Sequence, residues 1–127
     1  MLRDLSKKIG ADTVRFNVKD ASAGDIGKLL RKIYEFTESG AEYAGFMKEA
    51  MMSSLHTVMI GQGVSPKKIA HKYCWETGGY HDMAIVYDEH PYLLVIMTDM
   101  DAGGNEANSY IQKLASLVDG IHGNFYG

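Results

Sequence analysis

Residues 68–75 read Lys68-Ile69-Ala70-His71-Lys72-Tyr73-Cys74-Trp75, and two further segments of similar character follow at His81–Tyr87 and Tyr92–Thr98. All three are short and rich in Val, Ile, Tyr and Met, which predicts β-strands. Residues 88–91 leave room only for a tight connection between the last two segments, so we expect an antiparallel hairpin there. Because the last segment shows no polar alternation, it predicts a strand that is covered on both faces.

Two helices are predicted before the strands. Ser22-Ala23-Gly24-Asp25 resembles a capping box with Asp in the place of Glu, and Gly40 is suited to end the helix as a left-handed cap. The apolar residues of this first helix follow helical spacing, at Ile26, Leu29, Leu30, Ile33 and Tyr34. Upstream, Leu5–Ile9 is expected to be a short helix stopped near Gly10, and Thr13–Val18 an extended stretch.

The second helix is predicted over Glu42–Leu55, and a third follows the strands. The apolar, Met-rich face of the second helix is expected to pack into the core rather than form an adaptable binding surface. It comprises Tyr43, Phe46, Met47, Ala50 and Met51. The third helix follows Gly103-Gly104, with a predicted buried face at Ala107, Tyr110, Ile111, Leu114 and Val118.

The predicted fold class is α+β, as part of an α/β sandwich: two N-terminal helices, a three-stranded antiparallel sheet and a C-terminal helix. With 127 residues and no repeat or linker, the chain is expected to form a single partial domain over residues 1–127. A strand buried on both faces needs two covering layers, and the C-terminal helix supplies one. The second layer is either the leading helices or a part that this chain does not contain.

Composition and charge exclude several classes. The net charge of −3 and the lack of clustered Lys and Arg argue against nucleic-acid binding. No apolar run approaches the roughly 20 residues of a membrane span, and Met1-Leu2-Arg3-Asp4 lacks the apolar core of a secretory signal. The lone Cys74 excludes an internal disulfide and a multi-cysteine metal site. The group His71, His81, Asp82 and His90 matches no ligand spacing, so neither a metal nor a cofactor is expected.

The ordered string of these elements resembles the class A β-lactamase-like, penicillin-recognising serine hydrolases. The resemblance rests on 68–75, on Tyr80–Tyr87 and Pro91–Thr98, and on the helix Ala21–Tyr34, and it spans roughly residues 10–120. It implies the C-terminal portion of a fold with an α/β sandwich, a helical lobe and a catalytic groove between them. In this family a Ser-x-x-Lys nucleophile, a Ser-Asp-Asn-type loop and a Lys-Thr-Gly-type strand act on β-lactams or D-Ala-D-Ala-like peptides through an acyl-serine.

The resemblance makes Lys72 the strand lysine that faces the substrate carboxylate. By strand alternation, Lys72 shares a face with Ala70 and Cys74, opposite Ile69, His71, Tyr73 and Trp75. Tyr73 then stands in the Thr place and Cys74 in the Gly place, and Cys74 adds a side chain where backbone and substrate approach closely. Trp75 would supply the backbone N–H of the oxyanion hole. These four are the predicted substrate-binding residues. A rival alignment on Glu76-Thr77-Gly78 replaces the lysine with an acid and would repel an anionic substrate.

No catalytic residue is predicted in this chain. The tetrad Ser65-Pro66-Lys67-Lys68 has the Ser-x-x-Lys form, but it runs straight into a strand, whereas the motif needs a helical turn to bring the amine to the serine. No Ser-x-Asn or Tyr-x-Asn triplet occurs. Cys74 as a nucleophile would need a base nearby. His71 lies on the opposite strand face, which leaves His81 as the second candidate base by sequence proximity.

Three readings stay open. The first is a fragment of an extracytoplasmic serine hydrolase, inactive alone, that binds a small-molecule or peptide substrate. The second is a non-catalytic binding or scaffold domain that reuses the fold and is completed by homo-oligomerisation. The third is an unrelated small α/β enzyme built around Cys74 and the histidines.

Overall fold

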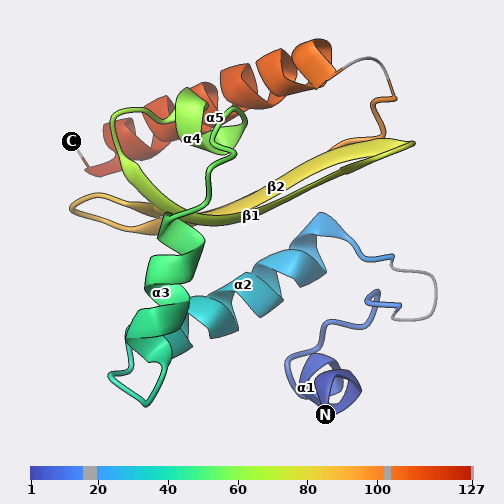
Figure 1. Ribbon diagram of the computed structural model, residues 1–127, viewed down its shortest axis with the longest axis vertical. Helices are drawn as coiled ribbons and strands as arrows, with labels where there is room; N and C mark the ends of the chain where they lie inside the picture. The colour runs from blue at the N-terminus through green and yellow to red at the C-terminus, as the bar shows by residue number, and fades with distance from the viewer. Residues whose placement is uncertain (16–19, 102–103, 127) are drawn as a thin grey trace.

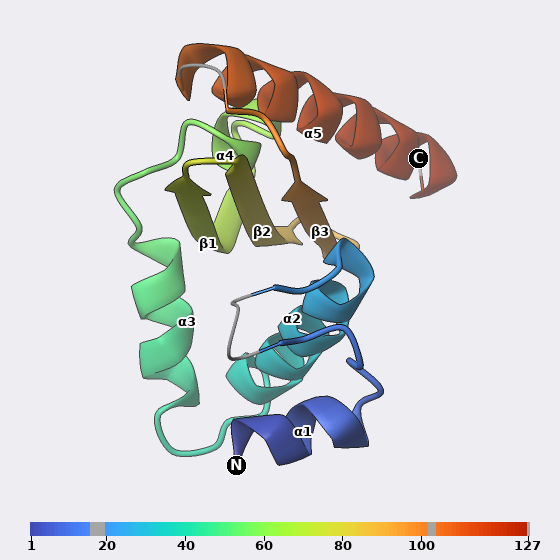
Figure 2. The same ribbon diagram turned by 90° about the vertical axis from the view of Figure 1, so that its right-hand side faces the viewer.

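The sheet lies between two layers of helices in the computed structural model, which describes residues 1–15, 20–101 and 104–126 (Figure 1). The elements in chain order are α1 (Leu2–Lys8), α2 (Ala23–Thr37), α3 (Ala44–Met52), α4 (Ile60–Gly63), β1 (Lys68–Glu76), β2 (Gly79–Tyr87), β3 (Tyr92–Met97) and α5 (Gly104–Tyr126). Helices α4 and α5 cover one face of the sheet, and α2 and α3 cover the other. Figure 2 shows α1 beyond α2, away from the sheet. The predicted α+β architecture is confirmed.

The sheet has the order β1-β2-β3, with both pairs antiparallel. The register pairs Glu76 with Gly79, so Thr77-Gly78 is a two-residue turn. Gly78 has φ +90, a conformation that favours glycine, which is why the β1–β2 turn needs it. The predicted β2–β3 hairpin is also present. Each observed strand lies within two residues of its predicted bounds.

Strand alternation divides the core into two clusters. Ile69, Val86 and Leu94 face α4 and α5, where they pack with Ile60 and Ile111. The other faces of the same strands pack against α2 and α3 through a second set, comprising Leu30, Ala70, Ile85, Leu93 and Val95 with Met51 and Met52. The last strand is covered on both faces, and the leading helices supply the second layer, but the two faces differ. Leu94 and Ile96 are buried on the α4 and α5 side, whereas Leu93 and Val95 are only half-buried on the α2 side.

The start of α2 follows the predicted cap. The hydroxyl of Ser22 accepts a hydrogen bond from the Asp25 backbone N–H at 3.2 Å. The Asp25 carboxylate accepts from the backbone and the hydroxyl of Thr13, at 2.7 and 2.6 Å, and pairs with Lys28 at 2.8 Å. The Lys28 hydrogen bond, followed by those from Thr13, lowers the pKa of Asp25 to about 2. This network ties the segment before α2 to the helix.

Several helix predictions were wrong in detail. Helix α2 ends at Thr37, three residues before the left-handed Gly40. Helix α3 spans Ala44–Met52 rather than 42–55, because Tyr43, with φ 66, is its left-handed N-cap. Tyr43 and Phe46 are exposed, so only part of the predicted apolar face packs into the core.

One residue of the predicted buried face of α5 was wrong, and the expected extended stretch before α2 is seen only in part. Tyr110 of α5 is 54% exposed, and Ala115 takes a buried place beside Ala107 and Ile111. Helix α4 was not predicted. Of the expected extended stretch 13–18, residues 16–18 lie outside the described residues, and in 13–15 only Arg15 forms a bridge, with Asp20.

Close backbone approach explains one glycine of α4. A Cβ placed on Gly63 would lie 2.5 Å from the Gln112 carbonyl oxygen and 2.8 Å from Ala115 Cβ. Helices α4 and α5 therefore contact each other through a position where any side chain would force them apart. None of the helices in the described part of the chain has the length and apolar character that crossing a membrane requires.

Candidate functional site

Strand β1 carries all four predicted substrate-binding residues and lies at an edge of the sheet. Its only strand neighbour in the described residues is β2, so its outer edge is free to pair. A free strand edge presents a row of unpaired backbone N–H and C=O groups to a ligand or another strand. The predicted division of β1 into two faces is confirmed, since Ala70 packs towards α2 while Ile69 packs towards α5.

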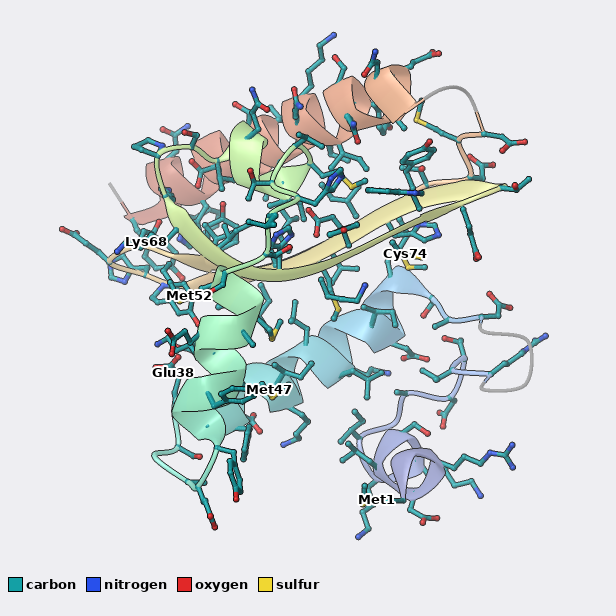
Figure 3. The ribbon with its side chains drawn as sticks, in the orientation of Figure 1. Met1, Glu38, Met47, Met52, Lys68 and Cys74 are labelled. Atoms are coloured by element: carbon teal, nitrogen blue, oxygen red, sulfur yellow. The ribbon has the colours of Figure 1, made fainter. Side chains whose placement is uncertain are left out.

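Lys72 and Cys74 lie on the α2 side. Both side chains are exposed, and Cys74 points from the sheet towards the start of α2 (Figure 3). They line a cavity of about 180 Å³ whose other walls include Ile26, Met83 and Met97. The walls are largely apolar, so the Lys72 ammonium is a marked positive charge in this part of the surface.

Lys72 also lines a second, wider groove of about 540 Å³. Helix α3 forms its far wall, through Phe46, Met47, Ala50 and Met51. The Lys72 ammonium donates a hydrogen bond to the carbonyl of Tyr73 and lies 5.2 Å from the centre of the Tyr73 ring. The one cation is thus shared by two apolar recesses, which suits a ligand with a negative charge and apolar groups.

Tyr73 and Trp75 lie on the other face and form an aromatic cluster with His56. The rings of Tyr73 and Trp75 stack with centroids 5.0 Å apart, and His56 lies 4.3 Å from Tyr73 and 4.4 Å from Trp75. His56 comes from the loop between α3 and α4. The cluster fixes the end of β1 that carries Cys74 and Trp75 against this loop. No sequence periodicity indicated it, because residues 53–59 belong to no helix or strand.

A buried pair supports the middle of β1. His71 Nδ1 lies 3.0 Å from Asp82 Oδ1, and Asp82 Oδ2 accepts a hydrogen bond from the Ile60 backbone N–H at 3.0 Å. Asp82 thereby links β1, β2 and the start of α4. His81 is on the opposite face of β2, where its Nδ1 accepts from the Thr98 backbone N–H.

Cys74 has no activating base in this arrangement. His81 is its direct cross-strand partner, but the Nδ1 of His81 is engaged by Thr98, and no hydrogen bond joins the two side chains within the described residues. His71 is on the other face and is bound to Asp82. A thiolate nucleophile needs such a base or a positive environment that holds the proton off.

The other residues that the sequence raised as possible site residues lie apart from one another in the structure. His90 lies in the β2–β3 turn, far along the sheet from His71 and His81, and no group of three metal-ligating side chains converges in residues 1–15, 20–101 and 104–126. Glu76 ends β1 and Thr77-Gly78 forms the turn to β2, so the residues of the rival alignment connect two strands. Ser65 to Lys67 form a turn and Lys68 begins β1, so the serine and the lysine are not brought together on a helix.

The chain is similar to known proteins both in sequence and in fold. The model of the beta-lactamase enzyme family matches residues 3–121. Among solved structures, PBP-A and a PBP-A variant solved as an acyl-enzyme complex with penicillin G each superpose with a TM-score of 0.81 at 17% identity. The match covers 97% of this chain and 51% of PBP-A, so the chain spans about half of that protein. No curated protein matches the sequence significantly.

Proposed function

Because the chain belongs to the beta-lactamase enzyme family, we propose that it forms the substrate-binding part of a β-lactamase-like serine hydrolase and carries no nucleophile of its own. In the intact enzyme, the substrate is a β-lactam or a D-Ala-D-Ala-type peptide that is cleaved through an acyl-serine. PBP-A, with which this chain shares its fold, is described as an acyl-enzyme with penicillin G. The observation that carries the proposal is the exposed Lys72 on the free-edged strand β1.

The positive charge of Lys72 suits β1 to bind the carboxylate of a substrate. Both β-lactams and C-terminal peptides present a carboxylate, and Lys72 is a cation between two apolar recesses. An exposed ion pair contributes only about 0.2–1 kcal/mol, but a substrate that fills the groove removes water and strengthens the attraction. Apolar groups on the substrate then occupy the recess beside α3.

The three residues after Lys72, Tyr73 to Trp75, would contact the substrate through the free edge of β1. Extended backbone can pair with a peptide or amide along a free edge, which leaves side chains above and below to select among substrates. In this proposal Trp75 provides its backbone N–H to the developing oxyanion. In comparison with the glycine expected there, Cys74 narrows the space through which the substrate approaches the strand, and Tyr73 stacks on Trp75.

We expect the chain alone to bind the substrate without hydrolysing it. Its one Ser-x-x-Lys tetrad, Ser65 to Lys68, is in a turn and cannot present the amine to the hydroxyl. Without a nucleophile, a serine hydrolase keeps only the small rate enhancement of binding and the oxyanion hole. The intact family member would act outside the cytoplasm, where peptidoglycan and β-lactams are found, and would confer antibiotic resistance if β-lactams are its substrates.

A second candidate function is a scaffold that assembles through β1. The free edge of this strand is flanked by exposed apolar side chains, among them Trp75 at 50%, Phe46 at 74% and Leu55 at 100%. Exposed strand edges with apolar flanks pair readily with other chains. A homo-oligomer built through β1 would bury the surface that the first proposal assigns to the substrate.

Three measurements separate these proposals. Intact-mass spectrometry after incubation with penicillin G should find no covalent adduct, while ligand-detected NMR should find reversible binding. A stable adduct on a serine would overturn the claim that the chain lacks a nucleophile. Sedimentation velocity should find a monomer; a tight oligomer in which penicillin G no longer binds would favour the scaffold.

A further inference from the structure

A further recess lies at the end of the sheet opposite Cys74. The β2–β3 turn and the last turns of α5 enclose it, with a volume of about 240 Å³. Its lining is contributed by two segments far apart in the sequence, Asp88, Glu89 and His90 from the turn and His122, Gly123 and Tyr126 from the helix. No residue of β1 takes part, so this recess is independent of the proposed substrate-binding strand.

Aromatic rings form the walls of the recess. The His90 ring stacks on Tyr126 with centroids 4.3 Å apart and an interplanar angle of 26°. The His122 ring lies between Tyr92, at 4.2 Å, and Tyr126, at 4.8 Å. His122 Nε2 donates to the His90 carbonyl at 2.8 Å, which fixes the two histidines relative to each other. The rings therefore offer flat faces in a set arrangement.

Two carboxylates, Asp88 and Glu89, line the recess, and the ion pairs of Asp88 lie beside it. The Lys67 ammonium bridges Asp88, at 2.9 Å, and Asp119, at 2.5 Å, and Tyr92 donates its hydroxyl hydrogen to Asp119. The hydrogen bond from Lys67 lowers the pKa of Asp88, which therefore stays ionised. Glu89 is exposed and forms no ion pair within the described residues. Asp88 also lies 3.8 Å from His122 Nε2. Of the two carboxylates that line the recess, Glu89 is therefore the one without an ion pair in the described residues.

We propose that this recess binds a guanidinium cation. A guanidinium group is planar, sheds its water more readily than an ammonium and can stack on an aromatic face while donating two hydrogen bonds to one carboxylate. The exposed His90 ring stacks on Tyr126 with one face, and its other face would receive the guanidinium. Glu89 is the lining carboxylate without an ion pair in the described residues. A metal ion fits less well, since no three ligating side chains converge in the described parts of the chain.

The test is an NMR titration of the full chain with methylguanidinium, compared with methylammonium at equal ionic strength. Methylguanidinium should shift the amide signals of residues 88–90 and 122–126 in a saturable way, with a dissociation constant on the order of millimolar. Methylammonium should bind at least about threefold more weakly, because it cannot stack. Shifts that do not saturate, or equal affinity for both cations, would overturn the proposal.

Two glycines of α5 supply a matched pair of variants. A Cβ on Gly123 or on Gly120 meets nothing within 4 Å, so we expect the helix to accept leucine at either position, yet only Gly123 lines the recess. Gly123→Leu should abolish the saturable shifts and Gly120→Leu should keep them. Glu89→Gln should weaken methylguanidinium binding by up to about fivefold, the upper end of the range for an exposed ion pair. Unchanged affinity in Gly123→Leu or in Glu89→Gln would show that the recess is not the binding site.

Discussion

The carboxylate of Asp82 lies within 3.0 Å of both His71 Nδ1 and the backbone nitrogen of Ile60, and both paired side chains are almost fully buried. One side chain thereby joins the candidate substrate-binding strand to its neighbour and to α4. This junction lies directly beneath Lys72. The position of β1 relative to the helices therefore depends on it.

Replacing Asp82 with Ala should destabilise the fold by about 2–5 kcal/mol, because two buried donors lose their acceptor at about 1–3 kcal/mol each. Urea denaturation followed by circular dichroism measures this change. Asp82→Asn keeps an oxygen that can serve one of the two donors and should cost about half as much. A loss below about 1 kcal/mol for Asp82→Ala would mean that water replaces the carboxylate.

The close approach of α4 and α5 makes Gly63 intolerant of any side chain. Gly63→Ala would place a methyl group 2.5 Å from the Gln112 carbonyl oxygen and should destabilise the protein by about 1–3 kcal/mol. Gly120→Ala is the matched control in open space, and it should be neutral or stabilise by up to about 1 kcal/mol through helix propensity. Equal midpoints for the two variants in thermal melts would contradict the packing.

The Asp25 network should give stability a dependence on acid pH. The pKa of Asp25 is lowered from 3.8 to about 2 in the folded chain, so its contribution is present above about pH 4 and is lost as the pH falls through about 2. The difference in melting temperature between the wild type and Asp25→Asn should therefore be constant from pH 5 to 7 and shrink towards pH 2. A difference that does not change across this range would rule out the lowered pKa.

Trp75 is the single tryptophan and stacks on Tyr73, so its fluorescence should report ligands that bind along β1. Penicillin G should change this emission in a saturable way, and Lys72→Met should weaken the apparent affinity at least about threefold, as expected for the loss of one ion pair. Lys68→Met removes another exposed lysine of the same strand and is the control. If both variants bind equally well, Lys72 is not the carboxylate ligand.

Cys74 should react as an ordinary thiol. With His81 held by Thr98 and His71 on the opposite face, neither histidine is placed to take the proton of the thiol. Iodoacetamide should label Cys74 at neutral pH at about the rate of free cysteine, and His81→Ala should leave this rate within about twofold. Labelling that is much faster and is slowed in His81→Ala would favour an enzyme built around the thiol.

The elements that the sequence predicted well are those whose burial repeats along the chain. The alternation in β1, the uninterrupted apolar run of β3 and the Ser22 cap each depend on neighbours a few residues away, and all three are observed. Tyr110 was misplaced because periodicity locates a helix face only to within one neighbouring position, and the smaller Ala115 fits closer to α4.

The features that escaped prediction depend on contacts between distant segments. Helix α4 is one turn long and is held by Asp82, 22 residues away, so its own sequence carries little signal. His56 has no apolar pattern around it and gains its place only from the rings of Tyr73 and Trp75. Lys72, Tyr73, Cys74 and Trp75 were selected by resemblance, and their role in binding stays a prediction.

The two faces of β1 have an evolutionary consequence. Lys72 and Cys74 border open recesses, so mutations there can change what the strand recognises without a large cost in folding. Tyr73 and Trp75 are interlocked with His56, so a change at one of them demands compensation at the others. Selection can therefore adjust ligand preference at every second residue of the strand, while the residues between them preserve its shape across diverging descendants.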